Sequence, residues 1–304
     1  MASSRLETIA AAGGSELPVA FRPARRAGFM RLFVRNRIAL VGLVLVLLFA
    51  ALSALGPLLM PYDPYLPELA LRLQGPSLAH PFGTDEVGRD ILTRIAYGAR
   101  FSLLMGVVAM SIAACIGVPL GLQAGYRSGW SDIAIMRGVD VMMTLPSIVL
   151  AIAIVSVLGA GVTSVVIAVG ITSTPAFARL TRAVALTLRE QDFVAAARVV
   201  GASDLRILRR HILPNSLPPI IVQASLGVGT TILTASALGF LGLGVEPPTP
   251  EWGAMLSRGR SYVSVAPNLV VFPGLAIALL VLGFNLLGDG LRDALDPRMK
   301  QMTR

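Results

Sequence analysis

Residues 141 to 178 read VMMTLPSIVLAIAIVSVLGAGVTSVVIAVGITSTPAFA, a run of 38 residues without a charged side chain. A helix needs about 20 apolar residues to cross about 30 Å of hydrocarbon. Gly159-Ala160-Gly161 near the middle of the run is a turn signal. The run therefore predicts two membrane-spanning helices joined by a tight turn, the first of them borrowing residues upstream of Val141.

The rest of the chain repeats this apolar pattern. Hydrophobic residues make up 55% of the sequence and charged residues only 14%, against about a quarter charged in soluble domains. With the 141–178 run counted twice, the sequence predicts an all-α polytopic membrane protein with six transmembrane helices and both termini on one side. The other uncharged runs are Ile38–Met60, Phe101–Tyr126, Ile212–Val245 and Ser261–Gly288.

The positive residues give the orientation. With both termini in the cytoplasm, 20 of the 26 Lys and Arg residues fall on the cytoplasmic side, as the positive-inside rule expects. The predicted organisation is a cytoplasmic tail (1–36), a first transmembrane helix (37–60), an extracytoplasmic segment (61–100), a five-helix core (101–290) with a cytoplasmic loop (179–215), and a cytoplasmic tail (291–304).

Several kinds of chemistry are missing from the sequence. The only lysine is Lys300, so the chain cannot form a phosphate-binding loop, and any ATP and Mg²⁺ would be bound by another polypeptide. His80 and His211 have no partners at metal-ligand spacing. The net charge of +9 lies beside apolar spans without interleaved aromatics, which indicates membrane topology rather than nucleic-acid binding. We expect no catalytic residue, metal or cofactor on this chain.

The cytoplasmic loop is predicted to form two short helices. Asp192 is placed to cap the first, and Gly201 to end it in a left-handed conformation. Ser203 would cap a second helix over Asp204–His211, and Pro214 suits the first turn of the next span.

Two interpretations of this loop remain open on the residues alone. Ala195-Ala196-Ala197 present little side-chain bulk, so a partner could approach the first helix closely and any movement there would pass to the attached spans. Alternatively, the Arg-rich second helix lies on anionic lipid.

The same residues resemble a known motif. Ala196-Ala197, Gly201 and Ile212-Leu213-Pro214 are similar to the EAA loop of permease subunits from binding-protein-dependent ABC importers. The resemblance implies a coupling helix that docks on an ATPase subunit. The sequence departs from the motif at one position, where Ala195 replaces its Glu. The coupling residues implied are Phe193, Ala195, Ala196, Ala197, Gly201, Ala202, Ser203, Leu213 and Pro214.

Further stretches from about residue 35 to 300 resemble the dipeptide/oligopeptide/nickel permease group, and within it the second of the two permease types. They are Asn36–Gly42, His80–Asp85 with Gly88-Arg89-Asp90, Tyr97–Arg100, Gly239–Gly244, the Pro247-Pro248-x-Pro250-x-Trp252-Gly253 segment and Asn285–Asp293.

This resemblance implies a type I ABC importer permease fold in a bacterial or archaeal inner membrane. It also implies a sister permease subunit, two ATP-binding subunits and an extracytoplasmic substrate-binding protein, with membrane lipid around the assembly. Peptides are the expected substrate, and nickel chelates, glutathione or another small solute remain alternatives.

The substrate path is less defined. Polar residues inside the spans are candidates for lining it or for interhelical hydrogen bonds: Gln223, Thr230, Thr231, Thr234 and Asn285. Two rival classes are kept. An independent secondary transporter would need an ion-coupling carboxylate, for which Asp140 is the candidate, and a membrane scaffold would need no path at all.

Overall fold

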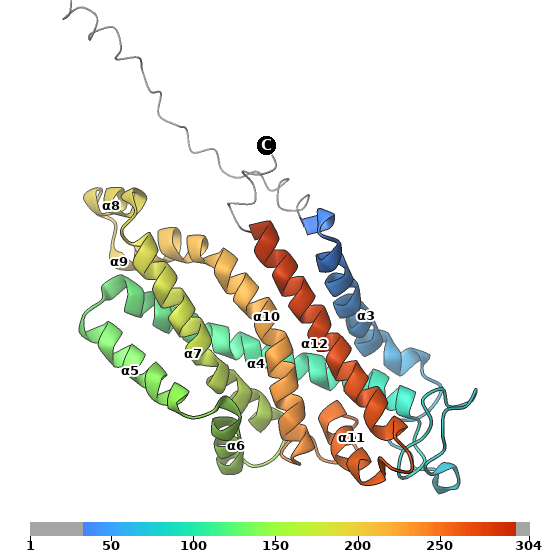
Figure 1. Cartoon of the computed structure of the whole chain (residues 1–304). Coiled ribbons are helices and arrows are strands. Elements are labelled where there is room, and N and C mark those ends of the chain that lie inside the picture. Colours follow the sequence, from blue (N-terminus) through green and yellow to red (C-terminus); the bar gives the residue numbers. More distant parts are fainter. Residues whose placement is uncertain (1–32, 296–304) are drawn as a thin grey trace, which may run out of the picture.

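A computed structural model describes residues 33–295, and these residues form helices without a β-strand (Figure 1). In chain order the elements are α3 (Arg37–Leu59), η1 (Leu69–Leu71), α4 (Ile91–Arg127), α5 (Trp130–Thr144), α6 (Ser147–Leu158), α7 (Val162–Leu188), α8 (Asp192–Val199), α9 (Asp204–Ile207), η2 (Leu208–Ile212), α10 (Leu213–Phe240), α11 (Trp252–Gly259), η3 (Arg260–Tyr262) and α12 (Asn268–Leu295).

Five helical segments in residues 33–295 are long and apolar enough to cross a membrane, and one bent pair of helices meets the same criteria when the two are taken together. The pair is α5 and α6, which meet at an angle of 93°. Pro146 is the N-cap of α6 and Leu145 before it is extended, as a residue preceding proline tends to be. Counted as one span, this pair brings the candidate spans in residues 33–295 to six, and this third span is broken rather than continuous.

The turn predicted in the apolar run is found at Gly159-Ala160-Gly161. Helix α6 ends at Leu158 and α7 begins at Val162. Gly159 and Gly161 both have positive φ, at 88° and 143°. Glycine adopts these values without the steric cost of a side chain.

Helix α4 is longer than the uncharged run that predicted it. It begins at Ile91 rather than Phe101, and Asp90 caps it by accepting a 2.7 Å hydrogen bond from the Thr93 amide. The first ten residues include Arg94, which is buried and donates to the Pro64 carbonyl oxygen (2.6 Å) and, more weakly, to that of Pro248 (3.3 Å). The span thus extends into the segment predicted as extracytoplasmic.

Helices α4 and α7 pack closely along a stripe of glycines at Gly117, Gly121 and Gly125. A methyl group added at Gly117 would lie 2.6 Å from the Thr174 carbonyl oxygen, and one at Gly125 would lie 2.5 Å from that of Arg182. Small residues at four-residue spacing let two membrane helices approach closely. The same device recurs between α3 and α12, where an added methyl at Gly42 would lie 2.5 Å from the Leu287 nitrogen.

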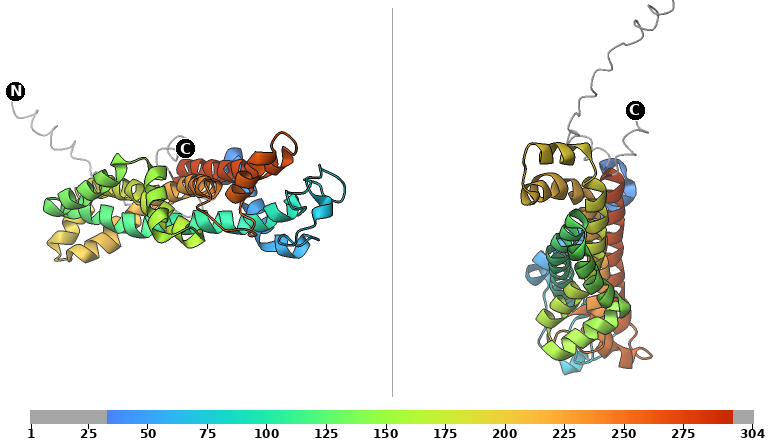
Figure 2. Two further views of the ribbon diagram at one scale, coloured as in Figure 1. Left: turned by 90° about the horizontal axis from the view of Figure 1, so that it is seen from below. Right: turned by 90° about the vertical axis from the view of Figure 1, so that its left-hand side faces the viewer.

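The two ends of the bundle differ (Figures 1 and 2). The start of α3, the end of α12 and the α8–α9 segment lie at one end, and α11 with the chain between α3 and α4 lies at the other. At this second end Trp252 is fully buried, donates to the Ile95 carbonyl oxygen at 3.1 Å and packs edge-on against Phe49. It is a core residue of the bundle.

Candidate functional site

Helix α8 carries four of the nine predicted coupling residues, and Gly201 ends it. Gly201 has φ of 78°, its amide donates to the Arg198 carbonyl oxygen (2.9 Å), and the Ala202 amide donates to that of Ala197 (3.0 Å). This pair of bonds is a Schellman motif, which satisfies carbonyls that a helix end leaves unpaired. The predicted cap at Asp192 is wrong: Gln191 is the N-cap, without a side-chain bond, and Asp192 is the first helical residue.

The second predicted helix does not stop at His211. Helix α9 covers only Asp204–Ile207, and Ser203 is its N-cap by position but makes no side-chain capping bond. A π-helical turn, η2, then leads directly into α10. Pro214 explains the turn, because its ring cannot donate and would clash with the carbonyl four residues earlier, so the helix widens to accommodate it.

The triple alanine of α8 faces two ways. Ala197 is buried with Val194 against the ends of α4 and α7. Ala195 and Ala196 are exposed. Ala195, at the position of the motif Glu, therefore lies on the outer side and leaves that position without a charge.

An aromatic ring joins α8 to two other helices. The Tyr126 hydroxyl, in the last turn of α4, donates a 2.9 Å hydrogen bond to Asp204 at the start of α9. The Arg198 guanidinium of α8 lies 5.5 Å from the centre of the same ring. Together with the buried contacts of Val194 and Ala197, these interactions fix α8 to the spans that follow and precede it.

The outer side of α8 is an apolar surface with a basic edge. Val199 and Val200 are 87% and 82% exposed, and Phe193 is partly exposed beside His211. We call this the α8 outer surface. A shallow cavity of about 390 Å³ opens on it, lined by Phe193, Ala196, Ala197, Val200, Ala202, Arg206, Arg210 and His211.

The two valines are the part of this surface that the sequence analysis missed. Val194 and Ala197 form the inner stripe of the helix, and Phe193, Ala196 and Val200 repeat the same helical spacing on a second stripe. A short helix with two apolar stripes has more apolar surface than it can bury in its own chain. The spacing of the apolar residues in the sequence was enough to predict the second, exposed stripe.

The remaining predicted coupling residues lie at the start of α10. Leu213 packs partly buried against the core beside α4, whereas Pro214 is exposed. Neither shares the α8 outer surface.

The polar residues predicted inside the spans divide between packing and exposed positions. Thr231 is buried and donates to the Gly106 carbonyl oxygen at 3.1 Å, so it joins α10 to α4. Thr234 donates to the Thr230 carbonyl oxygen of its own helix at 2.9 Å. Thr231 therefore serves helix packing, as the alternative interpretation expected.

Two of these residues face open space at α10 and α12. Gln223 lines a cavity of about 560 Å³, and Asn285 is exposed on α12 opposite Gly229. The cavity has one cationic side chain, Arg292. Its lining is Leu180, Asn215, Pro218, Pro219, Val222, Gln223, Leu226, Arg292 and Leu295.

Asp140, the carboxylate that an ion-coupled transporter would need, is paired. Its Oδ1 lies 2.8 Å from the Arg179 guanidinium of α7, and both side chains are about half exposed. Arg182 of the same helix makes a bidentate pair with Asp132 at 2.6 and 2.7 Å. A solvent-exposed, already neutralised carboxylate is a weak candidate for ion coupling.

Comparison with known families agrees with this architecture. The model of the binding-protein-dependent transport system inner membrane component matches residues 117–301. That of the N-terminal TM domain of oligopeptide transport permease C matches residues 26–76. The first match covers the end of α4 and the helices from α5 to α12, and the second covers α3 and η1.

Curated relatives align over most of both sequences. The dipeptide transport system permease protein DppC of Alkalihalophilus pseudofirmus is 52% identical over 266 residues, 88% of each chain. The glutathione transport system permease protein GsiD of Pectobacterium atrosepticum is 50% identical over 274 residues, covering 90% of this chain and 91% of the relative. GsiD of Escherichia coli O6:K15:H31 is 51% identical over the same length.

Among solved structures, the MetNI methionine ABC transporter in an inward-facing conformation has a chain of similar fold. The TM-score is 0.55 at 19% identity, over 66% of this chain and 96% of that one. This likeness bears on the fold alone. The family matches and the relatives show that the chain belongs to the binding-protein-dependent transport system inner membrane component family and is a multi-pass inner-membrane permease subunit of an ABC importer.

Proposed function

We propose that the α8 outer surface is where an ATP-binding subunit docks and delivers the energy of ATP to this permease. The observation that carries the proposal is the exposed apolar surface of Val199 and Val200, with Arg206 and Arg210 beside it, on a helix fixed to its own spans. Apolar surface of this kind at the end of a membrane protein indicates a protein interface. Movement of α8 would be transmitted through Tyr126 to α4 and α9.

The proposed orientation follows from this docking. The end of the bundle that holds α8 also holds the start of α3 and the end of α12, and it carries the larger share of the arginines. We assign this end to the cytoplasm. The end that holds α11 and the chain between α3 and α4 would then meet the substrate-binding protein outside.

A second permease is needed to enclose a path. Helices α5 and α6 have few buried side chains within this chain: only Val139, Ala151 and Val155 are buried. Such a broken, uncovered span is expected to pack on another membrane subunit, and we propose a sister permease there. Gln223 and Asn285 remain our candidates for the path lining, with the catalysis of ATP hydrolysis left to the partner subunits.

Peptides are the substrate class that we propose. Relatives at closely similar identity are named for dipeptide and for glutathione transport, and both are small peptidic solutes with free carboxylates. Glutathione import by the same assembly is therefore the second candidate, favoured by the GsiD relatives.

The docking proposal is tested by affinity co-purification of the tagged chain, co-expressed with its partners. Val199→Asp with Val200→Asp should abolish recovery of the ATP-binding subunits while the permease stays inserted. Val265→Asp is the matched control, since Val265 is 75% exposed outside the spans at the opposite end. Equal recovery of ATP-binding subunits from both variants would contradict the proposal.

A further inference from the structure

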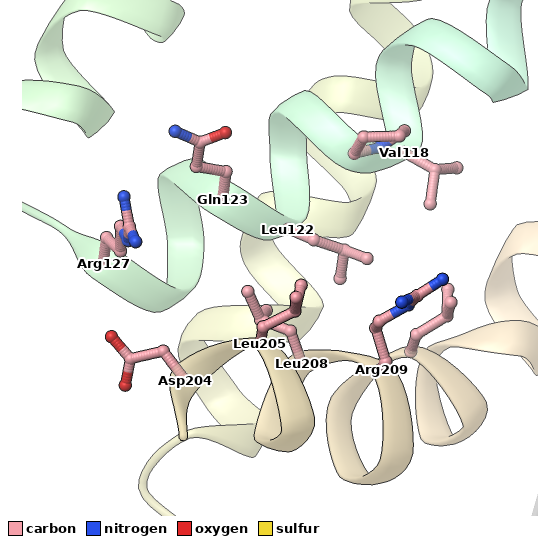
Figure 3. A pocket seen from close by; sticks show the side chains of 10 residues that line it. Val118, Leu122, Gln123, Arg127, Asp204, Leu205, Leu208 and Arg209 are labelled. Atoms are coloured by element: carbon pink, nitrogen blue, oxygen red, sulfur yellow. The ribbon is translucent and has the colours of Figure 1, made fainter.

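A second groove lies close to the α8 outer surface, on the side of α9 and η2 that faces α4. It has a volume of about 410 Å³ and runs between the last turns of α4 and the α9–η2 segment. Figure 3 shows Leu205 and Leu208 facing Leu122 and Val118 across it. Pro119 and Leu213 complete the apolar wall.

The rim of the groove is basic. Arg127 of α4 and Arg209 of η2 lie on opposite sides of it in Figure 3. Neither arginine forms an ion pair within residues 33–295, and both are exposed. The one acidic side chain on the rim, Asp204, already accepts the hydrogen bond from Tyr126.

Both walls pass from charged to uncharged sequence at the groove. On α4 the uncharged run of residues 101–126 ends at Arg127, and on the other wall Arg209 and Arg210 are followed by the uncharged run that begins at Ile212. Such a transition marks the level at which a spanning helix passes from hydrocarbon to headgroups. The groove therefore opens where lipid headgroups and acyl chains meet.

We propose that this groove binds an anionic phospholipid of the inner membrane. An acyl chain would lie along Val118, Leu122 and Leu208, and the headgroup phosphate would sit between Arg127 and Arg209. Guanidinium groups pair well with phosphate oxygens, and basic pockets between membrane helices are sites for anionic headgroups.

Charge decides between this lipid and a segment of the chain itself. Residues 1–32 carry five arginines and two glutamates, so they do not complement a basic rim. A neutral phospholipid could fill the apolar wall but would leave the two arginines without an anion. The proposal needs only the membrane location of the chain and is independent of ATPase docking.

The test is lipid binding to the complete transporter purified in mild detergent and exchanged into nanodiscs of mixed phosphatidylglycerol and phosphatidylcholine. Native mass spectrometry of the released complex then counts the retained lipids. Phosphatidylglycerol should be retained in preference to phosphatidylcholine. Arg127→Gln with Arg209→Gln should lower that preference about fivefold for each arginine, and Arg127→Lys should largely keep it.

The control is Arg137→Gln on α5, because Arg137 is also exposed and forms no ion pair within residues 33–295. Equal retention of the two lipids by wild type, or an equal loss in the control, would overturn the proposal. A photo-cross-linking residue at Leu205 gives a second measurement that does not depend on the arginine variants. A lipid adduct supports the proposal, and an adduct only to a partner protein overturns it.

Discussion

The hydroxyl of Tyr126 lies 2.9 Å from Oδ1 of Asp204 and donates a hydrogen bond that ties the end of α4 to the start of α9. The two residues are 78 positions apart in sequence. Because α9 continues through η2 into α10, this bond connects two spans at the level of α8. The cation of Arg198 over the same ring adds α8 itself to the connection.

Removing this hydroxyl should loosen α8 without unfolding the bundle. A hydrogen bond of this kind contributes about 1 kcal/mol, so Tyr126→Phe should speed amide exchange in α8 by about fivefold. Hydrogen–deuterium exchange of the solubilised chain measures this. Tyr62→Phe is the control, because the Tyr62 hydroxyl donates to the Ala79 carbonyl oxygen, in the chain between α3 and α4. Unchanged α8 exchange in Tyr126→Phe would show that the bond does not hold the helix.

Gly201 is needed at the end of α8 for its backbone conformation and not because a side chain there would clash within this chain. Gly201 has φ of 78°, and a methyl group built there would have no heavy atom within 4 Å. Gly201→Asn should keep most substrate uptake, because Asn tolerates the left-handed region, whereas Gly201→Val should lose it. Uptake in cells, normalised to the inserted permease, distinguishes the two. Equal loss in both would point to a side-chain clash with a partner instead.

The glycine stripe of α4 should be sensitive to a single methyl group. Gly121→Ala would push against the Ala178 carbonyl of α7, and overpacking of this kind costs about 1–3 kcal/mol. Gly138→Ala on α5 is the matched change, because it meets nothing within 4 Å and gains helix propensity. Thermal unfolding in detergent should show a lower midpoint for the first variant and an unchanged or higher one for the second. The reverse order would refute the packing assignment.

A buried carboxylate at the α11 end predicts a pH dependence of stability. Burial raises the pKa of Glu251 from 4.5 to about 7, although the amides of Gly253 and Ala254 donate to its oxygens. The folded state therefore binds this proton more tightly than the unfolded state. Stability should fall as pH rises from about 4.5 to about 7 and should change little from this group above that.

Glu251→Gln removes the titrating group and keeps a side-chain oxygen to accept an amide hydrogen. The unfolding midpoint of the solubilised variant should lose most of the pH dependence seen between pH 5 and 7 in the wild type. If the two proteins share the same profile, the dependence comes from another group.

The sequence predicts the parts of the fold that depend on the length of uncharged runs and on glycines that end helices. The turn at Gly159–Gly161 and the end of α8 at Gly201 are both found at the positions that these glycines predict. The break at Pro146 was not predicted, because proline in an apolar run is compatible with a kink, a span end or a broken span. Which one occurs depends on the packing of α5 and α6.

The remaining features of the fold could not be predicted, because they depend on polar residues whose partners are distant in sequence. Arg94 and Arg100 kept residues 91–100 out of the predicted apolar run, yet the structure buries Arg94 against Pro64 and Pro248, so α4 continues through both. Trp252 lies outside the uncharged runs of the sequence, yet it is in the core and donates to the Ile95 carbonyl oxygen. A local sequence pattern cannot identify these partners, because they are far from Arg94 and Trp252 along the chain.

Disulfide cross-linking from two positions of α8 tests ATPase docking most directly. In a Cys115→Ser background, Ala196→Cys lies on the exposed side of α8, and Val194→Cys lies on the buried side. With the partners co-expressed and single cysteines placed in the ATP-binding subunit, Ala196→Cys should cross-link to that subunit and Val194→Cys should not. Absence of any cross-link from Ala196→Cys in an assembly that still hydrolyses ATP and transports substrate would contradict the account.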